Sequence, residues 1–110
     1  MTAPVTRETL LVQALPSKAV TSVEVRRMTL LPDVEGGAHV HNGPVFGSIE
    51  LGSVVFQVGE EPRRTLTAGD VFYEPAHDTV TRWDATRDGV TFLGYFLLSD
   101  GEVPELTPVR

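Results

Sequence analysis

His39 and His41 stand one residue apart and are two of only three histidines in the 110-residue sequence. Alternate residues of a β-strand point to the same face of a sheet, so a strand through this pair would place both imidazoles side by side. Two neighbouring imidazoles are suitable ligands for a divalent metal ion. Histidine pairs with this spacing also occur on surface strands that bind nothing, so the pair alone leaves both interpretations open.

The segments around this pair have the pattern of a protein made of strands. Ten glycines and eight prolines divide the sequence at short intervals, and the apolar runs between them are rich in Val, Phe, Thr and Leu. We predict strands at residues 23–31, 39–41, 45–51, 54–58, 64–66, 71–74, 79–83 and 90–98. Gly52 and Ser53 suit a two-residue hairpin loop, and residues 84–89 suit a polar loop. The expected fold is all-β, a sandwich or closed antiparallel β-barrel whose interior forms a pocket for a small ligand.

The chain has the length of a single domain, which we predict over residues 1–110 with a barrel core at about 20–98. Residues 1–15 and 99–110 are expected to form terminal arms. Within the first arm, residues 6–14 suit either a helical turn or a strand. The second arm contains two prolines and two glutamates and suits a loose terminus or an arm laid on a neighbouring molecule.

Two runs of the sequence resemble the two motifs of the cupin superfamily. Residues 37–47, GAHVHNGPVFG, resemble the first motif, in which a glutamate and a glycine follow a histidine pair. Residues 69–75, GDVFYEP, resemble the opening of the second motif. The resemblance covers about residues 23–98 and implies a double-stranded β-helix of two packed antiparallel sheets, similar to a jelly roll and often dimeric.

The sequence departs from the cupin pattern at two positions that usually hold metal ligands. The resemblance places the glutamate of the first motif at Val45 and the histidine of the second motif at Val80, and both residues are aliphatic. Two histidines alone bind a metal weakly, so another ligand is needed, and Glu74 is one of the other possible donors. His77 is the remaining imidazole. In the loop after Pro75 it either swings toward the cavity and completes the ligand set, or stays in solvent as a turn residue.

Three further side chains are candidates for proton transfer or ligand binding. Tyr73 and Glu74 end a predicted strand near the expected mouth of the pocket, where either could carry a proton. An exposed glutamate before a proline is the alternative for Glu74. Arg82 follows Val80 by two residues and shares its predicted face. Arg82 either binds a ligand carboxylate bidentately or forms an ion pair with Asp84 at the barrel rim.

The composition narrows the chemistry and the partners. The sequence contains no cysteine, so any metal must be held by nitrogen and oxygen ligands. Its formal net charge of −6 disfavours binding to nucleic acid. It shows neither an apolar run long enough to span a bilayer nor a secretory signal, so we expect no membrane partner and a cytoplasmic location. The unpaired edge strands of a small barrel favour a homodimer.

These observations favour two functions from different classes. The first is a metal-dependent enzyme that holds Zn, Fe, Mn or Ni through the three histidines and acts on a small organic acid or carbonyl compound by isomerase, cyclase, lyase or dioxygenase chemistry. In that enzyme Glu74 or Tyr73 moves protons and Arg82 binds the ligand. The alternative is a metal-free cupin that binds a small ligand, or serves as an accessory protein, without catalysis. A structural dimer with a vestigial pocket is a third possibility.

Overall fold

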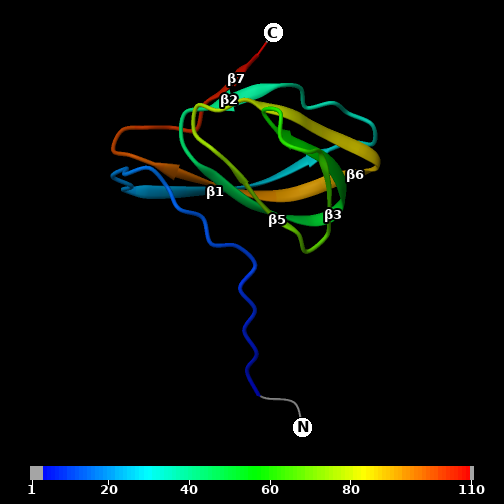
Figure 1. Ribbon diagram of the computed structural model, residues 1–110, viewed down its shortest axis with the longest axis horizontal. Helices are drawn as coiled ribbons and strands as arrows, with labels where there is room; N and C mark the ends of the chain where they lie inside the picture. Colours follow the sequence, from blue (N-terminus) through cyan, green and yellow to red (C-terminus); the bar gives the residue numbers. More distant parts are fainter. Residues whose placement is uncertain (1–3, 110) are drawn as a thin grey trace.

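The computed structural model describes residues 4–109 and, within those residues, is built of strands, turns and loops without a helix (Figure 1). The strands are β1 (Ser22–Leu30), β2 (His39–His41), β3 (Val45–Val58), β4 (Arg64–Thr67), β5 (Val71–Glu74), β6 (Val80–Leu98) and β7 (Leu106–Pro108). The strands pair with one another in antiparallel orientation. The predicted all-β, jelly-roll-like fold is confirmed, but the sheet that the described strands form is not closed into a barrel. This described part of the chain therefore offers no helix long and apolar enough to cross a membrane.

β3 and β6 are long, bent strands that each belong to two halves of the sheet. In one half, residues 90–98 of β6 pair with β1 on one side and with the first part of β3 on the other, and β5 pairs with that part of β3. In the other half, the second part of β3 pairs with β4 and with residues 80–85 of β6, and β2 and β7 follow. The two halves curve around a common interior (Figure 1).

The bends in β3 and β6 occur where two glycines meet. Gly52 has a φ of 75° and Gly89 a φ of 67°, a region that glycine adopts more readily than other residues. A Cβ atom on Gly52 would collide with the carbonyl oxygen of Gly89. The predicted hairpin at Gly52 and Ser53 and the predicted polar loop at 84–89 are wrong, because both segments continue as bent strands. Within the bend, the hydroxyls of Ser53 and Thr86 form a 2.5 Å hydrogen bond.

The core lies between the two halves and is rich in aromatic side chains. The ring centroid of Trp83 lies 4.8 Å from those of Phe72 and Phe92 and 5.5 Å from that of Phe56. All four side chains are buried, and full burial of a large apolar side chain contributes roughly 1.5–3 kcal/mol. Trp83 comes from one half and Phe92 from the other, so their contact holds the two halves together.

The two ends of the chain differ from each other. Residues 6–14, predicted as a helical turn or a strand, adopt neither, and residues 8–11 line a hollow together with residues 46–48 of β3 and Val71 of β5. The prediction of a loose C-terminus is wrong, because β7 pairs with β2. The Asn42 side chain also holds this segment, donating to the Val103 carbonyl (2.9 Å) and accepting from the Glu105 N–H (3.1 Å). The outermost parts of the predicted arms, residues 1–3 and 110, lie outside the described residues.

Candidate metal centre

His39, His41 and Glu74 form a buried cluster. The two histidines lie on β2 and Glu74 is the last residue of β5, and the three are 4%, 6% and 5% exposed. The Nε2 atom of His39 lies 3.4 Å from Oε1 of Glu74, and the Nε2 atom of His41 lies 3.0 Å from Oε2. One atom from each residue, all within 4.8 Å of one another, could bind the same ion. The alternation of β2 places both imidazoles on one face, as the spacing predicts.

Burial and neighbouring charge act in opposite directions on the pKa values of this cluster. Burial alone would lower the pKa of His39, but Glu74 and the carbonyl of Gly37 raise it above its ordinary value. Burial alone would raise the pKa of Glu74, but the imidazoles of His39 and His41 lower it below its ordinary value. The cluster therefore stabilises an ionised carboxylate next to positive charge.

The nitrogen atoms of the cluster fit a metal ion. Nδ1 of His39 lies 2.9 Å from the carbonyl oxygen of Gly37, and when Nδ1 donates to that oxygen, the lone pair of Nε2 faces the cluster. Nε2 of His41 is close to Glu74 but not aligned with it for a hydrogen bond, so it is buried without a hydrogen-bond partner. Unpaired buried polar atoms are costly. A divalent cation between His39, His41 and Glu74 would satisfy this nitrogen and balance the carboxylate.

The cluster forms part of the wall of a cavity of about 380 Å³. The remaining lining comes from β1, β6, the C-terminal segment and a few other positions: Arg26, Met28, Thr29, Leu30, Val34, Gly36, Val45, Trp83, Phe92, Phe96, Pro104, Glu105 and Leu106. Most of these residues are apolar, and the volume is in the range of pockets that hold small organic molecules. A ligand there would meet the metal donors on one side and apolar surface on the others.

No protein-family model matches this sequence, and no curated protein sequence matches it. Solved structures do match. The DMSP lyase DddQ from Ruegeria pomeroyi has a TM-score of 0.66 and 19% identity, over 76% of this chain and 42% of its own. Oxalate decarboxylase from Bacillus subtilis has a TM-score of 0.67 and 20% identity, over 79% of this chain and 24% of its own. Oxalate oxidase with the substrate analogue glycolate has a TM-score of 0.66 and 17% identity, over 79% of this chain and 46% of its own.

The fold is the cupin fold. The matched structures are jelly-roll proteins of the cupin fold, which confirms the fold implied by the motif resemblance. This chain spans less than half of the length of each of the three.

The candidate centre departs from the cupin pattern in the strand that supplies the carboxylate. The motif resemblance places a glutamate at Val45 on β3, whereas the carboxylate of the cluster belongs to Glu74 on β5. Val45 and Glu74 are direct partners in the register of β3 and β5, and both are buried. Side chains of directly paired residues project to the same side, with Cβ atoms about 5 Å apart. Glu74, predicted as a proton carrier, therefore lies where it can replace the missing cupin glutamate as a ligand.

His77 and Tyr73, two other residues predicted at this site, lie outside the cluster. The backbone N–H of His77 donates to the carbonyl oxygen of His41 (2.9 Å), but its imidazole is not among the grouped metal donors. His77 has a left-handed φ of 63° and lines a separate hollow together with Tyr73. Tyr73 alternates with Glu74 along β5 and packs against Phe46, with ring centroids 4.9 Å apart. The placement of His77 fits the turn-residue interpretation.

Arg82 also lies outside the cavity lining, because β6 is irregular next to it. The register between β3 and β6 shifts beside Arg82 and leaves Thr81 without a partner. A bulge of this kind changes the alternation of side chains. Val80 and Trp83, 0% and 5% exposed, therefore share the buried side, and the prediction that Arg82 shares the face of Val80 is wrong. Arg82 instead forms an ion pair with Asp84 (3.4 Å), the predicted alternative at the rim.

Arg26 and Trp83 line the cavity, although the sequence singled out neither for binding. Arg26, Met28 and Leu30 are every second residue of β1 and therefore share a face. This spacing is a signal that could have placed Arg26 on the cavity face. The adjacent Arg27 weakens this signal, since an arginine pair is typical of a solvated strand. The bulge that precedes Trp83 has no sequence signal.

Proposed function

We propose that this protein is a metal-dependent enzyme acting on a small organic acid or carbonyl compound. The observation that carries this proposal is the buried set of two imidazoles and one carboxylate in the wall of a cavity large enough for such a compound. The cupin-fold structures similar to this chain include a lyase, a decarboxylase and an oxidase. They support the fold, and the donors of this chain support the metal chemistry.

His39, His41 and Glu74 would hold the ion, and the candidates are Fe, Mn, Zn and Ni because each accepts nitrogen and oxygen ligands. Two histidines and one carboxylate also form the donor set of many non-haem iron sites. Oxalate decarboxylase, which this chain resembles in fold, has Mn(II) centres. Three protein donors leave coordination positions open, and a bound ion would act there as a Lewis acid on a ligand oxygen.

The protein itself would orient the ligand and exclude water. The apolar walls contributed by Met28, Phe92 and Phe96 remove water from the cavity, which strengthens electrostatic interactions inside it. The contact between His39 and the carbonyl of Gly37 fixes the orientation of that imidazole. Lyase, isomerase, cyclase and dioxygenase reactions are all compatible with such a site, and the products formed from a substrate panel distinguish them.

The test of this proposal is turnover by protein loaded with one metal at a time. The full chain is stripped with a chelator, reloaded with Fe²⁺, Mn²⁺, Ni²⁺ or Zn²⁺, and incubated with small carboxylic, hydroxy and oxo acids, with and without oxygen. We expect at least one loaded form to consume one of these compounds, as followed by proton NMR, and a His41→Ala variant to consume none. If every loaded form binds compounds without consuming any, the protein is a ligand-binding cupin and the proposal is wrong.

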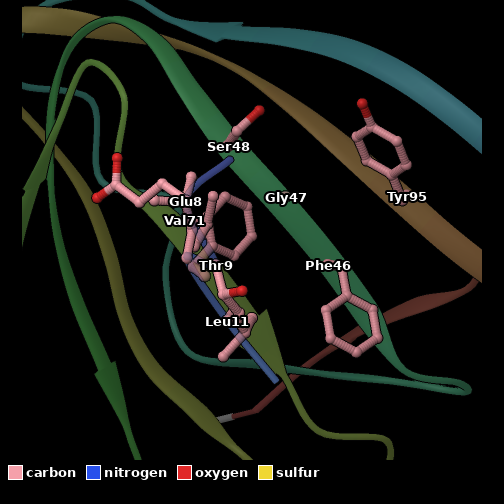
Figure 2. Close-up of a pocket in the computed structure, with 10 residues that line it drawn as sticks. Glu8, Thr9, Leu11, Phe46, Gly47, Ser48, Val71 and Tyr95 are labelled. Carbon is pink, nitrogen blue, oxygen red and sulfur yellow. The ribbon is translucent and has the colours of Figure 1, made fainter. Parts of the chain in front are cut away.

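We also propose that the protein is a homodimer, because its N-terminal arm exposes apolar side chains that a second copy would cover. Leu10 and Val12 are 58% and 85% exposed. Leu11 lies beside Val71 at a hollow that also includes Tyr95, on the face of the sheet opposite the core (Figure 2). Contiguous exposed apolar surface often marks a protein interface.

Light scattering tests the dimer. We expect a mass near twice the 12.0 kDa chain for the full protein, and a mass near one chain after removal of residues 1–15. A full-length protein with the mass of one chain at every concentration would contradict the proposal. The cytoplasmic location and the lack of nucleic-acid and membrane partners stay predictions from the sequence.

A further inference from the structure

Trp83 carries a buried polar group that a metal at the cluster leaves unpaired, as it also leaves Nδ1 of His41. The residue is 5% exposed, and its indole Nε1 has no hydrogen-bond partner among the described residues. A buried donor left unpaired is costly, and indole N–H groups in protein interiors usually find an acceptor. The acceptor for this N–H is therefore expected from a bound molecule.

The indole of Trp83 lies at the cavity lining, and the edge that carries Nε1 is buried beside Gly36. Trp83 and Gly36 both line the cavity, and Cδ1, the carbon bonded to Nε1, lies 3.2 Å from the position that a Cβ atom on Gly36 would occupy. That Cβ atom would also collide with the carbonyl oxygen of Trp83, so the close approach requires glycine. The rings that pack against the indole belong to Phe56, Phe72 and Phe92, which offer no hydrogen-bond acceptor.

Arg26 provides a second recognition point. Among the described residues that line the cavity it is the one lysine or arginine, and its Cζ atom lies 5.2 Å from the ring centroid of Phe96. This stacking orients the guanidinium plane. Nε of Arg26 donates a hydrogen bond to the carboxylate of Glu24. Within the described part of the chain, the two terminal nitrogens of Arg26 form no hydrogen bond. A planar fork of free N–H groups suits a carboxylate.

Phe96 connects this point with the metal donors. Its ring centroid lies 6.0 Å from that of His41. The Phe96 ring would therefore lie between a carboxylate bound at Arg26 and the cluster. The surface between them is apolar. Glu105 also lines the cavity, and because both it and Arg26 are exposed, water and salt screen its repulsion of an anion as well as the attraction of Arg26.

We propose that the cavity recognises a short amphipathic oxo acid, whose carboxylate pairs with Arg26, whose apolar body packs against Phe96, and whose oxo oxygen accepts the N–H of Trp83. This inference rests on the proposed metal-dependent function of the same cavity and names its substrate class. The two recognition points act on different groups of the ligand, so each can be removed separately.

Isothermal titration of the full chain with three probes tests the inference. The probes are 4-methyl-2-oxopentanoate, 4-methylpentanoate, which lacks the oxo group, and 4-methyl-2-oxopentanamide, which lacks the charge. We expect the oxo acid to bind roughly threefold to tenfold more tightly than 4-methylpentanoate, as one hydrogen bond allows. We expect it to bind at least on the order of tenfold more tightly than the amide. Because a metal could also contact the oxo group, the protein is titrated before and after treatment with a chelator.

Two variants assign each preference to its residue. Trp83→Phe keeps an aromatic ring and removes the N–H, so it should lose the preference for the oxo group in the chelated protein and keep the preference for charge. Arg26→Gln should show the reverse. Trp83 is the only tryptophan, so its fluorescence in the unaltered protein gives a readout that depends on no variant. We expect its emission to shift to the red with the oxo acid and not with 4-methylpentanoate.

Equal affinity for the three probes, no binding of any of them, or an unchanged oxo preference in Trp83→Phe overturns the inference. Titration of both variants with Mn²⁺ separates it from the proposed function. We expect unchanged Mn²⁺ affinity, because neither residue is a candidate metal ligand. If the unaltered protein binds no metal but keeps both preferences, the metal proposal fails and the recognition of an oxo acid stands by itself.

Discussion

His41 and His77 lie on adjacent stretches of backbone but in opposite environments. The N–H of His77 donates to the carbonyl of His41 at 2.9 Å. His41 is 6% exposed and belongs to the buried cluster, whereas His77, in the loop after Pro75, is exposed and lines a separate hollow. Strand alternation directs His41 into the cavity, while the left-handed φ of 63° at His77 gives its side chain another direction.

The same contrast occurs within β5, where Glu74 faces the cluster and its neighbour Tyr73 packs on the other side. All three candidate ligands thus lie on strands, and the loop histidine contributes none of them. Strands hold side chains at fixed spacings and directions, which an ion with several ligands requires. Variants on the cavity side should therefore lose metal binding, and variants on the loop side should keep it.

The largest effect is expected from Glu74→Ala. The variant leaves two buried imidazoles without the carboxylate, and its Mn²⁺ affinity should fall by more than about 100-fold, since loss of groups that merely orient ligands already costs roughly 10–100-fold. Isothermal titration measures the change. Glu50→Ala is the matched control, because Glu50 is a partly exposed glutamate of β3 that forms an ion pair with Arg27 and lies outside the cluster. Similar losses in the two variants would mean that Glu74 has no special role.

A smaller effect is expected from exchanging the members of the Val45 and Glu74 pair. The double variant Val45→Glu, Glu74→Val moves the carboxylate across the two paired strands, to the position that the cupin motif resemblance indicates. Because the two positions project to the same side of the sheet, we expect it to bind Mn²⁺ roughly tenfold more tightly than Glu74→Val alone. No recovery in a double variant that retains its thermal unfolding transition would show that the two positions are not equivalent.

His77→Asn should have almost no effect. Asparagine tolerates the left-handed region well, so we expect the free energy of unfolding to change by less than about 0.5 kcal/mol and the Mn²⁺ affinity to stay the same. His41→Asn, with the same change of side chain on the cavity side, should lose metal binding. A large loss of affinity in His77→Asn would place this histidine in the ligand set.

The smallest effect is expected from Tyr73→Phe. The ring of Tyr73 packs against Phe46, and the variant keeps that ring while it removes only the hydroxyl. Turnover and metal affinity should therefore both be unchanged in the assays described above. A drop in turnover at unchanged metal affinity would restore Tyr73 as the proton carrier predicted from the sequence.

The sequence predicts the strands at this site well and their register poorly. The bounds of β2 and β5 agree with the prediction, and the alternation of β2 correctly groups His39 with His41. The sequence predicts Glu74 only as one of several possible donors, because its position opposite Val45 depends on how two strands far apart in the sequence are aligned. Local patterns do not contain that alignment.

The bent strands show the same limit of local patterns. Gly52 is typical of a hairpin, and only its contact with Gly89, more than thirty residues later, shows that it bends a continuous strand. The bulge at Thr81 likewise reverses the expected directions of Arg82 and Trp83 and depends on the pairing of β6 with β3. In both cases long-range pairing overrides the local signal.

The most direct test of the candidate metal centre is the metal content of protein purified without chelators or added metal. Elemental analysis should find close to one divalent transition-metal ion per chain, and a His39→Ala, His41→Ala double variant purified in parallel should have lost it. A native protein that contains no more metal than this variant, and that does not take up Fe²⁺, Mn²⁺, Ni²⁺ or Zn²⁺ when they are supplied, would contradict the assignment of His39, His41 and Glu74 as a metal site.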